Sequence, residues 1–425
     1  MRSSGRGAGA VLLVVLALCG SLLVGCSDDH DSADTSAAAT RPVTMAEAQQ
    51  VLDERAQAIR DNDLTTFLHG IDTSNRALVR RQRRYFANMQ RLPLAVLNYR
   101  VLKAQWPGAL RSSAWGKHVL LPQVRVATQL EGFDVEPVQR VTGFAFARRD
   151  GTPVVVSELT GRNRQFPGYG PAPWDLVRIH VRSDDGTLQV YDDDTWARAG
   201  TVGRTLRRGI RDVVDGVPWT WSGHVVVYVF AKKQVLNSYE GVPGGNINHL
   251  GAMTFPMYSV LGREAVAGVR FTLLPSSLRA GQSFLDRIVR HELTHVAVGP
   301  RDDGAPTWIA EGISEYMGVR ELPEDQRRIA TVATRRARGA VNSMPASAGF
   351  NGHDQAWNYA LAWMACDYIV ATQGEPRLWE LMDALHAGGE GTSDARQDAV
   401  LTRVIGMDSH ELARHAAERI VEIYG

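Results

Sequence analysis

Two histidines four residues apart, His291 and His295, flank a glutamate, Glu292, in the segment HELTH. On an α-helix, side chains at positions i and i+4 lie on one face, so both imidazoles can reach the same metal ion. Imidazole is a common zinc ligand, and the glutamate between the two histidines is positioned to act as a general base. The segment therefore predicts a Zn²⁺ site of the kind that performs hydrolysis.

The residues around this segment have the pattern of a helix. From Ser283 the chain reads SFLDRIVRHELTHVAVG, in which apolar residues recur at helical spacing and Gly299-Pro300 forms a stop signal. We therefore expect the two histidines to lie one turn apart on the same helix. The alternative is a pair of surface histidines on an ordinary helix.

A catalytic zinc ion usually takes three protein ligands and leaves its fourth position open. The arrangement HExxHxxGxxH is excluded, because Val298 replaces the glycine and Arg301 replaces the last histidine. Downstream, residues 308–316 read WIAEGISEY, which predicts a second helix with Glu311 and Glu315 on one face. Two carboxylates thus face the same way.

These two segments resemble those of the gluzincin metallopeptidases, in particular the peptidase MA-like domains of bacterial proteins. Such domains have HExxH on one helix and a W-x-x-E-G-x-x-E/D-Y segment on the next, matched here by Trp308, Glu311, Gly312, Glu315 and Tyr316. The resemblance implies that Glu311 is the third zinc ligand. It also implies that Glu315 accepts the free ring N–H of a ligand histidine.

The spacing of the two segments leaves one alternative open. Fifteen residues separate His295 from Glu311, a shorter gap than in the best-known gluzincins. Glu311 and Glu315 could therefore exchange their roles.

A zinc site with a glutamate beside it implies hydrolysis of a peptide bond. In this reaction Glu292 takes a proton from water and passes it to the leaving amine. A developing oxyanion also needs a hydrogen-bond donor opposite the metal. An apolar helix is predicted from about residue 354 to residue 372, and the family tends to have a tyrosine near its start, which corresponds by position to Tyr359. A core tyrosine with a satisfied hydroxyl is an equal alternative, and His353 is a second candidate donor.

The first 26 residues predict export and lipid attachment. Arg2 and Arg6 precede an apolar run over residues 10–24, which fits a secretory signal and is short for a membrane span. The tetrad Leu23-Val24-Gly25-Cys26 resembles the lipobox of bacterial lipoproteins, which implies that Cys26 is lipidated and becomes the mature N-terminus. We therefore expect a protein that is lipid-anchored at the extracytoplasmic face of the cell membrane. An ordinary signal anchor is the alternative.

Four segments are expected along the chain: a signal peptide over residues 1–26, a disordered acidic tether over 27–42, an accessory domain over 43–200 and a metallopeptidase domain over 202–425. The third segment resembles an NTF2-like cone in the order of its elements, helices first and then strands. The predicted fold class is α+β: an NTF2-like helix-plus-curved-antiparallel-sheet domain, then a gluzincin domain with a mixed sheet, the HExxH helix and an α-helical C-terminal lobe.

Individual elements follow from hydrophobic periodicity. The accessory domain should contain helices over 44–70 and 76–90 and antiparallel strands within 94–107, 118–132, 136–159 and 174–193. In the second half we expect strands over 223–231 and 268–275, with Val269-Arg270-Phe271 as an edge that could bind an extended peptide. The C-terminal lobe should contain helices at about 323–340, 354–373, 375–387, 392–405 and 408–423.

Composition limits the partners. The chain carries 47 Lys and Arg against 46 Asp and Glu, a net charge of +1, which gives no support for a nucleic-acid partner. The expected partners are a peptide or protein substrate and the membrane, through the lipid anchor. Two functions are alternatives to a peptidase. The protein could be a catalytically inactive lipoprotein of metallopeptidase fold that acts as a cell-envelope binding or assembly module. It could also bind a small hydrophobic ligand in the NTF2-like cone.

Overall fold

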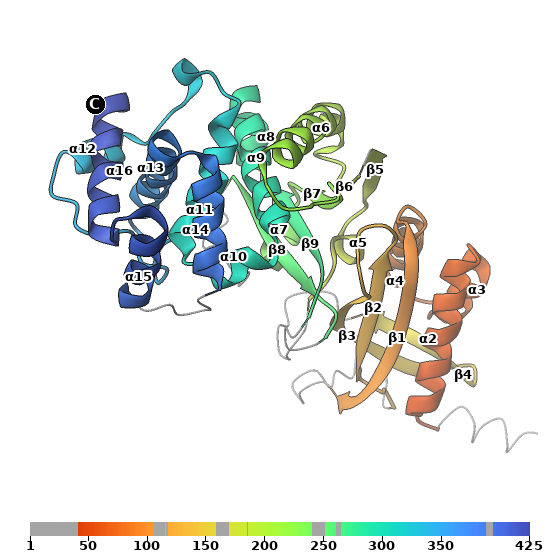
Figure 1. The fold of residues 1–425 in the computed structure, drawn as a ribbon. Coiled ribbons are helices and arrows are strands. Elements are labelled where there is room, and N and C mark those ends of the chain that lie inside the picture. The colour runs from red at the N-terminus through yellow and green to blue at the C-terminus, as the bar shows by residue number, and fades with distance from the viewer. Residues whose placement is uncertain are drawn as a thin grey trace, which may run out of the picture.

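The computed structural model describes residues 41–105, 115, 118–158, 170–184, 186–239, 251–260, 265–387 and 394–425. The predicted signal peptide, Cys26 and almost all of the tether lie outside these residues. The described chain is a mixed α+β structure with two sheets (Figure 1), which confirms that part of the predicted fold class. Within these residues, no helix combines the length and the apolar character that crossing a bilayer requires.

The N-terminal unit combines three helices with an antiparallel sheet. Its helices are α2 (Met45–Arg60), α3 (Leu64–His69) and α4 (Arg76–Met89), and its strands are β1 (Leu94–Gln105), β2 (Pro122–Leu130), β3 (Val138–Arg149) and β4 (Thr152–Glu158). The strands pair in the order β1-β2-β3-β4. Burial alternates along β2, as expected for a sheet with one covered face. The element order is the predicted one, and the NTF2-like assignment stays an interpretation.

The second sheet has five strands in the order β5-β6-β7-β9-β8. It begins with an antiparallel hairpin of β5 (His180–Asp184) and β6 (Thr187–Tyr191). The next two strands, β7 (Val225–Val229) and β9 (Val266–Leu273), run parallel to β6. The last strand, β8 (Ala252–Tyr258), is antiparallel to β9. Our assignment of residues 174–193 to the N-terminal sheet is therefore wrong. Every residue of β6 is buried, because both faces of this strand are covered, as is usual in parallel sheets.

The edge strand predicted at Val269-Arg270-Phe271 is also wrong. That segment lies in β9, which pairs with β7 on one side and β8 on the other. Among the described residues the two edge strands of this sheet are β5 and β8, and β8 contains Pro256. Proline cannot donate to a neighbouring strand and is therefore confined largely to edge strands.

Each face of the second sheet is covered by a different part of the chain. Helices α6 (Ala199–Gly216) and α9 (Gln282–Val298) share a hydrophobic core with one face. Side chains of the other face, including Leu188, Val226 and Tyr228, belong to the same core as the N-terminal unit. The two sheets are thus joined by continuous apolar packing, and the domain boundary at residue 200 stays a prediction.

A helical lobe follows α9 (Figure 1). Its longer helices are α11 (Thr307–Arg320), α13 (Gln355–Gln373), α14 (Glu375–His386), α15 (Asp394–Ile405) and α16 (Ser409–Tyr424), and the short helix α10 (Pro300–Gly304) lies between α9 and α11. Three other short helices come earlier in the chain: α5 (Pro173–Leu176), α7 (Lys233–Leu236) and α8 (Pro275–Arg279). The helix expected over 323–340 is reduced to α12 (Thr331–Ala337). Residues 324–326 form a 3₁₀ turn instead, and residues 327–330 are not helical. In this segment Arg327 donates hydrogen bonds to the carbonyls of Leu322 and Arg320.

Candidate metal centre

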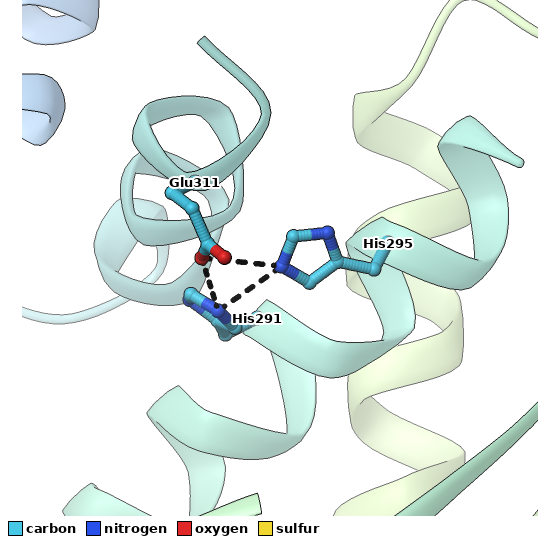
Figure 2. Close-up of side chains that lie close together, drawn as sticks. All are labelled: His291, His295 and Glu311. Carbon is cyan, nitrogen blue, oxygen red and sulfur yellow. Dashed lines mark hydrogen bonds and ion pairs between the residues drawn. The ribbon is translucent and has the colours of Figure 1, made fainter. Parts of the chain in front are cut away.

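Side chains from α9 and α11 converge on one point (Figure 2). The Nε2 atoms of His291 and His295 lie 3.2 Å apart, and Glu311 Oε2 lies 3.4 Å from each of them. Ligand atoms bound tetrahedrally at about 2.0–2.1 Å from a zinc ion are roughly 3.3–3.4 Å from one another. The triangle therefore has the size of one face of a tetrahedral zinc site, and no other such group of three occurs in the part of the chain that the structure describes.

Close packing of α11 on both of its neighbours brings Glu311 to this point. At Gly312 a Cβ atom would lie 2.6 Å from the carbonyl oxygen of Ala362 on α13, so only glycine allows this approach. At Gly318 a Cβ atom would lie 3.2 Å from the carbonyl oxygen of Arg287 on α9. Arg290 adds two hydrogen bonds from its guanidinium to the Gly318 carbonyl, at 3.1 and 2.9 Å, which join α9 to α11.

A carboxylate lies behind each histidine ring. Asp302 on α10 accepts a hydrogen bond of 2.8 Å from His295 Nδ1, which directs the other ring nitrogen toward Glu311. Asp302 could not be recognised from the sequence, because nothing in its spacing marks it as a partner of His295. Glu315 Oε1 lies 3.4 Å from His291 Nδ1, and this glutamate also pairs with Arg287. Glu311 thus lies in the triangle, whereas Glu315 lies on the outer side of His291.

The electrostatics of the three residues suit a cation. Burial disfavours protonation of His295, but Asp302 and Glu311 outweigh burial and raise its pKa well above the ordinary value. Burial favours the neutral Glu311 carboxyl, but the two histidines prevail and lower its pKa. Glu311 Oε2 is buried without a hydrogen-bond donor, and a buried acceptor without a donor is costly. A divalent metal would satisfy this oxygen, so these residues fit zinc.

Glu292 lies beside the triangle and is not part of it. The residue is buried, and its Oε2 atom accepts a hydrogen bond of 2.5 Å from the Thr254 hydroxyl of β8. Burial raises the pKa of Glu292, against the effect of both histidines and of this hydrogen bond. A raised pKa brings the carboxylate closer to the range in which a general base is effective. Thr254 was missed in the sequence because its strand was missed.

Tyr359, near the start of α13, lies in the wall of the same cavity. Its ring centroid is 6.3 Å from that of His291, and its hydroxyl donates to Asn351 Oδ1 at 3.0 Å. Burial and the carboxylates of Glu311 and Glu315 raise the pKa of Tyr359 well above its ordinary value, so the hydroxyl keeps its proton. The side chain of His353 is fully exposed, and this residue does not line the cavity.

The cavity that contains the metal centre has a volume of about 400 Å³. Part of its wall is formed by β8 and β9 and is mostly apolar, with Met253, Phe255, Pro256, Tyr258, Val266 and Val269. The residues expected to act together from the sequence, His291, Glu292, His295, Glu311 and Tyr359, all line this one cavity.

No family model and no curated protein matches this chain. Among solved structures, one that matches in part is an M1 zinc metallopeptidase from Deinococcus radiodurans. The sequence identity is 11%, the match covers 76% of this chain and 83% of that chain, and the TM-score is 0.30. A similarity at this level supports no conclusion about chemistry, so the function rests on the side chains of the site.

Proposed function

We propose that this chain is a zinc-dependent peptidase. One observation carries the proposal: His291, His295 and Glu311 form a triangle of zinc-ligand dimensions, and the carboxylate of Glu292 lines the same cavity outside that triangle. Three ligands leave one coordination position open, which is typical of catalytic rather than structural zinc sites.

Each residue of the cavity then has a distinct role. A zinc ion held by the three ligands supplies Lewis acidity and a water of lowered pKa. Glu292 accepts a proton from the attacking water and later delivers it to the leaving amine. The Tyr359 hydroxyl donates a hydrogen bond to the oxyanion that develops at the scissile carbonyl.

The substrate is an extended peptide that adds to β8. Strand β8 is an edge strand and lines the cavity of the metal centre. Its backbone N–H and C=O groups could therefore form hydrogen bonds with a peptide that adds to the sheet as a further strand. Pro256 of β8 and Val269 of β9, which line the cavity on the same face as Thr254, would contact the side chains of the bound peptide.

The enzyme is proposed to act at the extracytoplasmic face of the cell membrane, held there by a lipid on Cys26. Support for this location comes from the arginines, apolar run and lipobox-like tetrad within residues 1–26.

A peptide library incubated with a soluble form of the protein, from residue 27 onward, tests the proposal. We expect about one zinc per chain by elemental analysis, cleavage of a subset of peptides, and loss of cleavage when a chelator removes the metal. A chain that binds zinc but cleaves no peptide would instead support the inactive binding or assembly module. A chain that binds iron and no zinc would contradict the assignment of the metal centre.

A further inference from the structure

The turn between β2 and β3 joins the N-terminal unit to the wall of the metal cavity. Asp134 in this turn forms an ion pair of 2.5 Å with Arg270 of β9, and the two side chains are 0% and 2% exposed. The other oxygen of Asp134 accepts a hydrogen bond of 2.9 Å from the Leu130 amide, which fixes the carboxylate within its own turn. A pair so fully removed from water holds its two segments in one relative position, because separating the charges leaves each of them uncompensated.

Three further contacts hold the same turn. The amide of Val135 donates to the carbonyl of Ala267 at 2.8 Å, and His224 Nδ1 donates to the carbonyl of Gly132 at 2.9 Å. At Gly268 a Cβ atom would collide with Asp134 Oδ1, so the absence of a side chain allows the turn to reach β9. The turn is therefore fitted to this part of the second sheet.

Strand β8 links Arg270 to Glu292 in the metal cavity. Arg270 lies opposite Phe255 in the pairing of β9 with β8, on the face that packs against the N-terminal unit. The residue of β8 that precedes Phe255, Thr254, points to the opposite face because side chains alternate along a strand. Its hydroxyl bonds to Glu292. The position of β8 thus sets both the peptide-binding edge and the partner of the general base.

We propose that Asp134 and Arg270 are a positioning pair for β8, so that the N-terminal unit is a working part of the peptidase. This inference rests on the proposed function. Neither residue touches the substrate; the pair fixes β9, and β9 fixes the edge strand that receives the peptide.

Two variants test the pair. Asp134→Asn removes one charge with little change of shape, and the double variant Asp134→Asn/Arg270→Met removes both charges, which avoids an uncompensated arginine if the single variant does not fold. Glu158→Gln is the matched control. Glu158 forms a partly buried ion pair of 2.7 Å with Arg55 inside the N-terminal unit.

To separate an effect on the position of β8 from a general loss of stability, kcat/KM is measured for a long peptide from the library and for its shortest truncation that is still cleaved. We expect kcat/KM for the long peptide to fall roughly ten- to a hundredfold through a higher KM, as a misplaced binding element would cause. The truncated peptide spans too little of β8 to depend on its position and should keep its kcat/KM. Zinc content should also be unchanged.

Hydrogen exchange of residues 252–258 gives a readout that needs no activity. These amides should exchange faster in both Asp134 variants and at the parental rate in Glu158→Gln. If exchange of β8 and the ratio of long- to short-peptide cleavage match those of Glu158→Gln, the pair is only structural and the inference is overturned. If the parent cleaves no peptide, the proposed function fails, and exchange alone decides whether the pair positions β8.

Discussion

Three carboxylates, those of Glu311, Glu315 and Glu292, surround the same two histidines. Their positions indicate a different role for each. Glu311 Oε2 is 3.4 Å from both Nε2 atoms, Glu315 lies near the Nδ1 side of His291, and Glu292 bonds to Thr254. Only the first of them shares with the histidines a point at which one metal ion could contact all three residues.

Substitution of these glutamates one at a time should separate the three roles. Glu292→Gln should keep zinc and lose about 10²- to 10⁴-fold in turnover, because it removes a base and no ligand. Glu311→Ala should lose zinc affinity as well, and Glu315→Ala should weaken zinc binding by roughly ten- to a hundredfold. Zinc titration and peptidase kinetics on the same preparations measure these effects. Loss of zinc in Glu315→Ala together with retention in Glu311→Ala would show that the roles are exchanged.

The protonation of His295 leads to a prediction about pH. In the zinc-free protein its raised pKa means that pairing with Asp302 and Glu311 stabilises the fold fully below about pH 6.5, and that this contribution is lost as pH rises through the raised value. Zinc binds the neutral ring, so its affinity rises over the same range. The difference in Tm between zinc-loaded and zinc-free protein should therefore widen from about pH 6 to about pH 8. A constant difference in thermal unfolding across that range would contradict the assignment of His295 as a ligand.

At the scale of elements, local sequence patterns were sufficient for the helices that carry the site. Helix α9 follows from its apolar stripe and from Gly299, and α13 and α14 are separated at Gly374, as their sequence indicates. The predicted helix over 44–70 is divided instead, because Asn62 has a φ of 54° and Asp63 caps α3. Such a break depends on one residue within an otherwise helical pattern.

Local sequence patterns could not predict which sheet a strand joins or which distant segments make contact. Residues 180–191 alternate like any antiparallel hairpin, and only their parallel pairing with β7 assigns them to the second sheet. Asp302 and Thr254 have their functions through the fold, because each reaches a residue of α9 from another element. That His291, His295 and Glu311 meet at one point could be predicted, because the spacing of the histidines is local and the position of Glu311 resembles a known motif.

The contact of α11 with α13 can be tested at Gly312. Gly312→Ala places a methyl group 2.6 Å from the Ala362 carbonyl oxygen and 2.8 Å from Cys366 Sγ, in a region without free space. We expect a loss of about 1–3 kcal/mol in the free energy of unfolding and weaker zinc binding, since α11 must shift and Glu311 moves with it. Denaturant unfolding and zinc titration measure both effects.

Gly200→Ala on α6 is the matched control for this prediction. Its new Cβ atom would meet only the flexible Arg204 side chain at 3.7 Å, so no loss in the free energy of unfolding is expected. Equal stability of the two variants would show that α11 and α13 have room to separate.

At the scale of the whole molecule, the chain is proposed to combine a membrane anchor, a tether and two packed units. Cys26→Ser should abolish lipid attachment and leave the protein unprocessed or released from the membrane fraction. Intact-mass measurement of the membrane form should show a diacylglycerol adduct at residue 26 in the parent and none in the variant. A membrane form of the parent without the adduct would remove the lipoprotein proposal while leaving the metal centre unaffected.

The proline in the middle of β8 has a consequence for how copies of this protein tolerate crowding on a surface. An open strand edge is a template on which a second molecule can add its own edge, and this is a common start of aggregation. Pro256 leaves one position of that edge without an amide hydrogen, which interrupts a continuous ladder between two molecules. On the proposed function, the same edge would receive a short peptide for each turnover and still resist growth into an intermolecular sheet.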